Sequence, residues 1–489
     1  MNTNALLVVQ FLLIVFFFYA FFSSPHQRLS FSRKRFTSYF YKNGQLGSRF
    51  HSNPQPVFKF FYIFFIIREV YLIFLRSSFL EKIMKIRRKH NYEKIYTTIV
   101  RKRFKKNTPY LIAGDHFTSF YPRNLGFFYS KALDPKTSID FEDYKNRLLT
   151  YLNSLAFALN FYKNIELTTT ITPLFGKFFT RANIFNKPSD TLCSLLLALD
   201  FLINPKDNDF TSKNPEYRKI QNQAKNLATE LLNVHKDSLK EKILKHLEYL
   251  NSRLGLVDPK HSLSGIRDGA FRQSSFYENV VTWKTINLSL KHGLISQSDL
   301  KSYAKPEVLK KKIIVLFVKN KLIHNDLTQE SIFENNFSAD FLVAYSLKFF
   351  DLKNLKDLQI LKDQVDFILS TPKLISPIGV FYSSSRPARL ALPVRLFASK
   401  YMSRTIWSHW STELICLLHD LSICTKDTNY LVTGSKMYEE LLQKVLFYKG
   451  YPELYGQNLK IYQTPFYTSM IDTGWIVNFE YCRQILKTY

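Results

Sequence analysis

Apolar residues recur at helical spacing through most of the chain after residue 140, and this pattern limits the possible folds more than any other feature of the sequence. Few stretches show the strict alternation of apolar and polar residues that is typical of half-buried β-strands. Proline and glycine lie between the periodic segments, where they commonly end helices. The segments predicted to be helical are 143–163, 189–203, 217–251, 277–293, 298–321, 335–350, 354–370, 410–424, 434–449 and 474–488. The sequence therefore predicts an all-α protein.

The predicted helices are of ordinary length and show no periodic sequence repeat. A solenoid of recognisable repeats is therefore disfavoured. Helical hairpins arranged around a ring and a helical bundle are both compatible with the pattern, because hydrophobic periodicity reports the buried face of each helix and not the order of its neighbours.

The chain is strongly basic, with 68 Lys and Arg residues against 39 Asp and Glu residues and a formal net charge of +29. Such a charge indicates nucleic acid or an anionic membrane surface as a possible partner. Much of the positive charge lies early in the chain, and Lys, Asn, Phe, Tyr and Ile are abundant together, as a general codon bias would produce. We therefore predict no specific nucleic-acid site.

The cysteines indicate neither a metal site nor a disulfide framework, because they form no CxxC pair and have no histidine at ligand spacing. They are Cys193, Cys416, Cys424 and Cys482. The chain also lacks a glycine-rich phosphate loop, an HExxH motif, an EF-hand loop and a GxSxG motif. The sequence thus predicts no metal and no cofactor, and the thiols are expected to be buried in a reducing compartment.

Residues Ala5–Phe22 form a nearly unbroken apolar run of about 18 residues, at the lower edge of what spans a bilayer. No basic residue precedes the run, in contrast to a cleaved signal peptide. The basic residues that follow it closely are Arg28, Arg33, Lys34, Arg35 and Lys42. The positive-inside rule therefore predicts a transmembrane helix that anchors the protein, with its soluble domain in the cytoplasm.

A second apolar run, Val57–Leu75, is interrupted by charged residues, so it predicts an amphipathic helix and not a lipid-facing span. A basic stretch follows as far as Lys106, and it could contact anionic headgroups or form a solvated helix face. We therefore divide the chain into a membrane anchor with a basic linker, residues 1–55, and one helical domain, residues 56–489. In that domain, residues 56–109 are the leading amphipathic basic helices.

Two acidic motifs far apart in the chain could carry chemistry. Asp268 lies in Ser264–Arg272, and Glu453 lies in Pro452–Tyr455. Segments that contain tryptophan follow both motifs. A pair of carboxyl groups can act as general acid and general base.

Four further segments carry polar or aromatic residues suited to a sugar. They are 114–129, 336–345, 405–413 and 473–475. The fixed fork of a guanidinium suits paired hydroxyl oxygens, and an indole ring stacks on the apolar C–H face of a sugar. These four segments, together with Ser264–Arg272, contain the candidate substrate-binding residues Asp115, His116, Tyr121, Arg123, Asn124, Arg272, Asp340, Trp407, His409, Trp410 and Trp475.

The order of these motifs resembles that of the six-hairpin, (α/α)6-barrel glycosidases, which include inverting trehalases and processing α-glucosidases. The resemblance covers residues 110–489 and implies an (α/α)6 toroid of helical hairpins, here behind an N-terminal transmembrane helix. It implies Asp268 as the acid and Glu453 as the base, with Glu480 as a reserve base. The sequence departs from the family pattern at Asn124, where an Asp is more usual, and at Arg267, an inserted residue.

The function that the resemblance implies is inverting hydrolysis of an α-glycosidic bond in an oligosaccharide or glycoside. In such enzymes the two carboxyl groups stand roughly 6.5 to 9.5 Å apart, so that a water fits between the base and the sugar. Phosphate could replace water as the nucleophile. A noncatalytic sugar-binding or scaffold protein on the same fold is one alternative, and a basic helical protein that binds a membrane surface or nucleic acid is another. In these alternatives, Asp115 and Asp340 cap helices and the tryptophans pack in the core.

Overall fold

The computed structural model describes most of the chain, and most of the described residues are helical. The described residues are 36–51, 91–104, 111, 120–161, 169–174, 177–182, 190–205, 210, 213–259, 270–271, 274–327, 337–384, 389–390, 398, 400–464 and 467–487.

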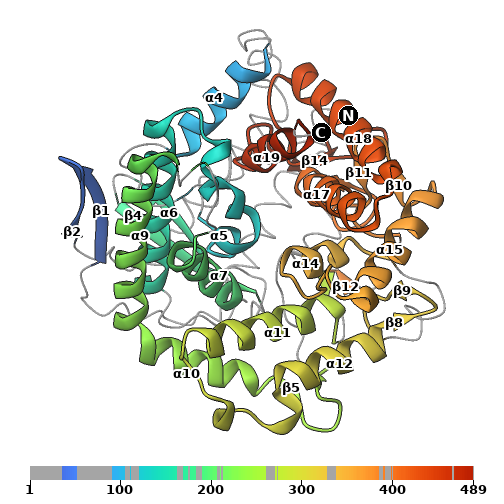
Figure 1. The fold of residues 1–489 in the computed structure, drawn as a ribbon, viewed down its shortest axis with the longest axis horizontal. Helices are drawn as coiled ribbons and strands as arrows, with labels where there is room; N and C mark the ends of the chain where they lie inside the picture. Colours follow the sequence, from blue (N-terminus) through green and yellow to red (C-terminus); the bar gives the residue numbers. More distant parts are fainter. Residues whose placement is uncertain are drawn as a thin grey trace, which may run out of the picture.

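The helices form an α/α toroid, in which an inner set surrounds the centre of the ring and an outer set covers it (Figure 1). Along the inner set each helix packs against the next. The inner helices are α5 (Arg123–Phe128), α7 (Thr191–Ile203), α11 (Phe276–Lys291), α14 (Asp340–Ser346), α17 (Ser408–Thr425) and α19 (Ile476–Leu486). The outer helices are α4 (Tyr92–Arg103), α6 (Phe141–Phe161), α9 (Pro215–Val234), α10 (Lys236–Leu247), α12 (Pro306–Phe317), α15 (Leu355–Ser370) and α18 (Thr428–Tyr448).

The burial of each helix follows from its place in the ring. The inner helix α7 is buried on nearly every side, and its sequence is almost uniformly apolar. The outer helix α9 buries only one stripe, formed by Tyr217, Ile220, Ala224, Ala228, Leu231 and Leu232. A helix that is apolar all round has to lie inside a protein, whereas a narrow apolar stripe fits a helix that faces water on one side.

Most of the predicted helices are confirmed over most of their length, but the segments 298–321 and 335–350 are helical only over α12 and α14, and one predicted helix is broken. The segment predicted as a single helix, residues 217–251, consists of α9 and α10, because His235 leaves the helical conformation at φ −103° and ψ 7°. Helix α5 was not predicted. It has only six residues, too few for a periodic pattern to show.

Outer and inner helices alternate along the chain, with α9 and α10 together in one outer position, so the inner helices run in the same direction. Contacts at both ends of α7 and α11 show this for that pair. Near their first residues, the hydroxyl of Tyr277 donates to Asp190 Oδ2 at 2.6 Å, and near their last residues Lys291 Nζ lies 2.6 Å from Asp200 Oδ1. The amino-terminal ends of the inner helices therefore gather at one end of the ring.

The last helix closes the ring against the beginning of the helical region. Asn478 of α19 donates its amide to the carbonyl of Phe128, the last residue of α5, at 3.0 Å. Glu480 accepts a hydrogen bond from Tyr92 of α4 at 2.8 Å and also binds Arg483. Glu480, which the resemblance offered as a reserve base, is therefore a buried residue of the seam between α4 and α19.

Short antiparallel strand pairs connect the helices. The longer pairs are β1 (Phe36–Lys42) with β2 (Gln45–His51), and β3 (Thr169–Leu174) with β4 (Lys177–Ala182). The two-residue pairs are β5 (Leu250–Asn251) with β6 (Leu256–Val257), β7 (Ala270–Phe271) with β12 (Arg389–Leu390), β8 (Val318–Lys319) with β9 (Leu322–Ile323), β10 (Ile375–Ser376) with β11 (Gly379–Val380), β13 (Ile406–Trp407) with β14 (Leu454–Tyr455), and β15 (Gln463–Thr464) with β16 (Tyr467–Thr468). The 3₁₀ turns among the described residues are η2 (Ser130–Leu133), η3 (Pro135–Thr137), η5 (Gln297–Asp299) and η6 (Ser302–Ala304).

The β1–β2 hairpin lies where the sequence predicted only a basic linker. Its turn, Asn43–Gly44, has φ of 52° and 76°, which are the positive values that a tight hairpin turn requires. The hairpin packs on the outer helices: Asn153 of α6 exchanges hydrogen bonds with the backbone of Tyr39, and Gln223 of α9 binds the backbone of Gly44 and Leu46. It therefore belongs to the helical body.

The described part of the chain contains no helix that combines the length and the hydropathy needed to cross a membrane. The predicted anchor, Ala5–Phe22, and the second apolar run, Val57–Leu75, lie outside the described residues.

One buried histidine predicts how stability depends on pH. Burial between α10 and α11 lowers the pKa of His246 to about 4, and its Nε2 lies 3.0 Å from Thr282 Oγ1. In the unfolded chain the pKa of His is about 6.5, so between these values the unfolded state binds a proton that the folded state does not. Stability therefore falls as pH decreases through this window, by roughly 2 to 3 kcal/mol from this group.

We expect urea unfolding of the wild type to lose stability between pH 6.5 and 4.5, and His246→Gln to lose less over the same range. Equal pH slopes for the two proteins would contradict the assignment to His246.

Candidate active site at the amino-terminal ends of the inner helices

The predicted site residues that the structure describes, apart from Glu453, lie at or just before the start of an inner helix. The residues are Tyr121, Arg123 and Asn124 at α5, Asp340 at α14, Trp407, His409 and Trp410 at α17, and Trp475 before α19. Glu453 lies in the connection between α18 and α19, and its carbonyl accepts from the backbone N of Ser408, the first residue of α17. Because the inner helices are parallel, these residues share one end of the ring. Asp115, His116, Asp268 and Arg272 lie outside the described residues, so their predicted roles stay predictions.

Backbone pairing joins the segments that precede α14, α17 and α19. Ser338 bridges to Ser383, Phe381 bridges to Ile406, and Ile406 pairs with Tyr455. The same segments also make single hydrogen bonds, from Ser408 N to Glu453 O at 3.0 Å and from Glu453 N to Met470 O at 2.9 Å. These links place Glu453 beside the first residues of α17.

Glu453 is buried, with 6% of its surface exposed. The hydroxyl of Tyr467, on β16, donates to Glu453 Oε2 at 3.1 Å. Both residues come from the connection between α18 and α19, where β15 and β16 form a hairpin. A hydrogen bond to a carboxylate favours its charged form, which is the form that a general base needs.

Asp340 is a second buried carboxyl at this end of the ring. It is the first residue of α14 and is 1% exposed. The hydroxyl of Tyr382 donates to Asp340 Oδ1 at 3.2 Å, while Oδ2 has no hydrogen-bond partner among the described residues. Ser338 Oγ accepts from the backbone N of Asp340, and Ala339 occupies the cap position, so the Asp340 side chain does not cap α14.

Trp407 links the surroundings of the two carboxyls. Its ring lies 6.2 Å from Tyr382, which binds Asp340, and 4.9 Å from Tyr401. The ring of Tyr401 lies in turn 5.2 Å from Tyr467, which binds Glu453. The two buried carboxyls therefore stand at the ends of one continuous row of aromatic rings.

Trp410 and Trp475 pack with α5 in a second aromatic group. Trp475 stacks on Phe128 at 4.8 Å and 22°, and it lies 6.2 Å from Trp407. His409 contacts both Phe128, at 4.4 Å, and Trp410, at 4.6 Å. Trp407, Trp410 and Trp475 are all less than 5% exposed. Their rings therefore contribute to the core, and a stacking role toward a sugar stays a prediction.

His409 is a neutral imidazole. Burial lowers its pKa well below the usual range, and the nearby ammonium of Lys131 lowers it further. The Asn478 amide nitrogen, oriented by the carbonyl of Phe128, lies 3.2 Å from Nδ1. Because this nitrogen can only donate, Nδ1 is the acceptor and Nε2 carries the proton. His409 is thus a hydrogen-bond donor that does not titrate near neutral pH.

The α5 residues give a weaker case for substrate binding. The guanidinium of Arg123 lies 5.5 Å above the ring of Tyr121, and Arg123 and Asn124 are nearly buried. Gly126 holds α5 tightly against α7, because a Cβ there would lie 2.6 Å from the carbonyl oxygen of Ser194. The short helix is therefore fixed in place with Arg123 at its start.

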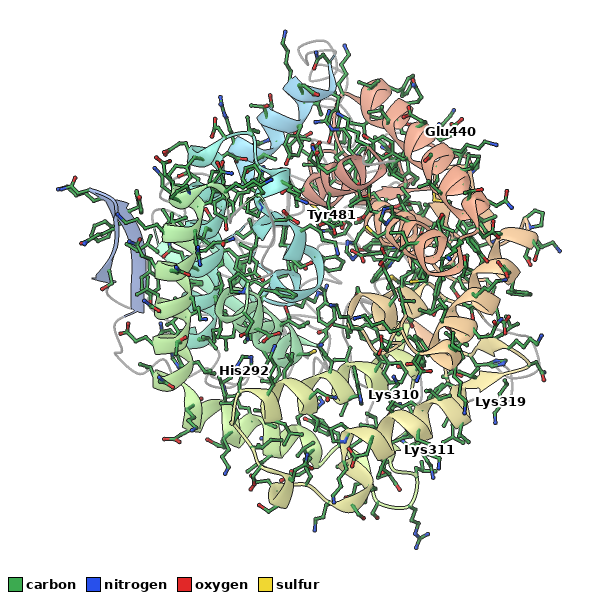
Figure 2. The ribbon with its side chains drawn as sticks, viewed as in Figure 1. His292, Lys310, Lys311, Lys319, Glu440 and Tyr481 are labelled. Atoms are coloured by element: carbon green, nitrogen blue, oxygen red, sulfur yellow. The ribbon has the colours of Figure 1, made fainter. Side chains whose placement is uncertain are left out.

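Three tyrosines at this end of the ring were not predicted from the sequence. Tyr382 and Tyr467 hold the two carboxyls, and Tyr129 lies behind Gly474. Lys131 and Glu413 were also missed; Lys131 Nζ lies 3.7 Å from the buried carboxylate of Glu413, between η2 and α17, where Tyr481 of α19 also lies (Figure 2). Tyr129 and Glu413 end two of the predicted segments, whereas Tyr382, Tyr467 and Lys131 lie outside them and reach this end of the ring only through the fold.

Comparisons with known proteins place few limits on function. No protein-family model matches the sequence, and a search of the curated proteins finds no match. Among solved structures, a crystal structure of D-mannose isomerase aligns with a TM-score of 0.46 and 11% sequence identity, covering 82% of this chain and 98% of that chain. A likeness at this level carries no inference about activity, so the case for function rests on the residues of this chain.

Proposed function

We propose that this protein is a glycoside hydrolase of the (α/α)6 toroid type that cleaves an α-glycosidic bond with inversion. The pairs of the proposed toroid are α4 with α5, α6 with α7, α9 and α10 with α11, α12 with α14, α15 with α17, and α18 with α19. This arrangement gathers the starts of all the inner helices, with their polar side chains, at one end of the ring.

The observation that carries the proposal is the buried carboxylate of Glu453, held by the hydroxyl of Tyr467 at the start of the inner helices. Glu453 accepts a proton from water, and the oxygen of that water attacks the anomeric carbon. Asp268 protonates the leaving oxygen, so the glycosidic C–O bond breaks as the new C–O bond forms on the opposite face. Asp340 and Trp407 bind hydroxyls and the apolar face of the sugar.

The test is the anomer that the full-length protein releases. We expect proton NMR of fresh reactions with a panel of 4-nitrophenyl α-glycosides to show the β-anomer of the free sugar first. Release of the α-anomer would contradict inversion. Binding of sugar without turnover would favour the noncatalytic alternative, and formation of a sugar 1-phosphate only when phosphate is added would replace water by phosphate as the nucleophile.

The apolar run Ala5–Phe22 supports a further proposal, that the enzyme is anchored in a membrane and its catalytic domain faces the cytoplasm. Fractionation of the full-length protein tests this proposal. Recovery in the membrane fraction after a high-salt wash, lost on deletion of residues 1–30, is the expected result. Release by salt alone would instead indicate a basic protein bound to the membrane surface.

A further inference from the structure

Helix α12 lies in a strongly basic part of the outer wall. From residue 301 to residue 321, a stretch that contains α12 and most of the β8–β9 hairpin, the chain carries seven lysines and one acidic residue, Glu307. Helix α18 is longer and carries two lysines and two glutamates. Positive charge is therefore not spread evenly over the outer wall.

Six of these seven lysines have free ammonium groups. Only Lys310 is paired, with its Nζ 2.6 Å from Asp357 Oδ2. Within the described part of the chain, no ion pair or hydrogen bond engages the ammonium groups of Lys301, Lys305, Lys311, Lys312, Lys319 and Lys321. Lys311 and Lys319 lie at the outer rim of the ring (Figure 2). These charges are available to an anionic partner.

Two exposed valines lie between the lysines of α12. Val308 is 43% exposed and Val315 is 56% exposed, with the exposed Lys311 between them. Residues three, four and seven apart share one face of a helix, so these three side chains form a single outward stripe. The opposite side of α12 is fixed in the core by Leu309, Ile313 and Phe317, which are fully buried. The stripe therefore cannot turn inward.

The β8–β9 hairpin extends the basic surface beyond the end of α12. Its turn, Asn320–Lys321, has φ of 49° and 66°, the positive values that a two-residue hairpin turn requires. Lys319 and Lys321 are thus carried on a tight, defined turn. We call Val308, Lys311, Lys312, Val315 and Lys319 together the α12 face.

The chemistry of the α12 face distinguishes between possible anionic partners. A nucleic acid offers phosphates, but it has no use for exposed aliphatic side chains, and its binding sites commonly add arginine forks and stacked aromatic rings. Residues 301–321 contain no arginine, and their aromatic residues, Tyr303 and Phe317, pack on the core. A phospholipid surface offers negative charge and an apolar layer beneath it, which matches lysines that alternate with valines.

We propose that the α12 face binds an anionic phospholipid surface. Val308 and Val315 insert between the headgroups, and the ammonium groups of Lys311, Lys312 and Lys319 lie beside the lipid phosphates, with their aliphatic stems along the apolar layer. The inference depends neither on the hydrolytic activity nor on the anchor Ala5–Phe22, because it concerns which side of the folded ring meets the membrane.

The test places a fluorescent label on the α12 face of the full-length protein. Cys424, the exposed cysteine, is replaced by Ser, and Val315→Cys is labelled with an NBD dye, whose emission rises and shifts to the blue when it leaves water. We expect this change with phosphatidylcholine vesicles that contain phosphatidylserine and not with phosphatidylcholine alone. The matched control is the dye on Val432→Cys of α18, a position 49% exposed, which should keep its emission in water with both vesicles.

The charges are tested by neutralising three lysines in the labelled protein. Lys311→Gln, Lys312→Gln and Lys319→Gln together should weaken binding of the face to the anionic vesicles by about 100-fold, because each lysine near such a surface contributes roughly fivefold. The matched control neutralises Lys426, Lys436 and Lys444 at and along α18, and should leave the signal at position 315 unchanged. Thermal unfolding of both triple variants checks that the fold is intact.

Four results would overturn the inference. An unchanged emission at position 315 with anionic vesicles would show that the face stays in water. An equal response with neutral vesicles would assign the change to the anchor, and an equal response at position 432 would assign it to the net charge of the whole protein. A response to a DNA duplex or to rising protein concentration, without a response to vesicles, would make the partner a nucleic acid or a second copy of the chain.

Discussion

Glu453→Gln is expected to lower kcat for an aryl α-glycoside by about 10²- to 10⁴-fold, the usual contribution of a general base. Glutamine has nearly the same shape and still accepts the hydrogen bond from Tyr467, but it cannot take a proton from water. Binding should change little, because an aryl glycoside contacts the site through its sugar hydroxyls. The expected signature is therefore a large loss of kcat at an almost constant KM.

The matched control is Glu440→Gln on α18, which removes an exposed carboxylate on the outside of the ring (Figure 2). It should keep wild-type kcat and KM. Thermal unfolding of both variants checks that the fold is intact. Activity of Glu453→Gln close to that of the wild type, with normal unfolding, would exclude Glu453 as the base.

Removing the partner of Glu453 should have a smaller and different effect. Tyr467→Phe deletes one donor to the carboxylate, which favours the protonated form of Glu453. The acidic limb of the kcat profile is then expected to move to higher pH, while kcat at the optimum changes little. A pH profile identical to that of the wild type would show that Tyr467 does not tune the base.

The sequence predicts the long inner helices well because a helix that is buried on most sides carries apolar residues on most sides, which its composition shows directly. In α7, residues Thr191–Leu199 are all buried, and most are apolar. In α17 the buried face also includes polar residues such as His409 and Glu413, yet Leu and Ile complete the pattern. Such long segments are the ones for which hydrophobic periodicity is most reliable.

Short elements are harder to predict from the sequence than long helices. Asn43–Gly44 between two alternating segments is a strong hairpin signal, and it was overlooked because the basic residues around it favoured a linker. The break at His235 has no proline or glycine to mark it. The two helices differ in their neighbours, since α9 packs on α6 and α7 and α10 packs on α11, and no local sequence pattern marks that change.

The candidate site was predicted only in part, for a physical reason. Asp340 and Trp407 lie next to helix starts, where local sequence patterns indicate exposed or functional ends. Tyr382, the partner of Asp340, comes from another connection, and Tyr467, the partner of Glu453, is brought back to it by the β15–β16 hairpin of the same connection; neither pairing follows from a local pattern. Periodicity also does not show that the tryptophans would pack against one another and not face solvent.

A buried arginine ties the first outer helices together. The guanidinium of Arg147 is fully buried, and its Nη2 donates to Asp143 Oδ2 at 2.5 Å, to the hydroxyl of Tyr96 at 2.9 Å and to the carbonyl of Thr137 at 3.0 Å. These partners belong to α6, α4 and η3. Since α19 packs on α4 and η3 to close the ring, Arg147 supports the closure as well.

Arg147→Met is expected to destabilise the fold by about 3 to 5 kcal/mol, because it leaves a buried carboxylate and a buried hydroxyl without their partner. Combining it with Asp143→Asn should recover part of the loss, since the amide oxygen still accepts from Ile139 N but carries no charge. The control, Lys362→Met, removes a partner of Asp366 in a partly exposed pair and should cost less than about 1 kcal/mol. The free energies of unfolding of all three variants are measured by urea unfolding. A loss of stability in Arg147→Met no larger than that in Lys362→Met would show that the guanidinium does not stabilise the seam.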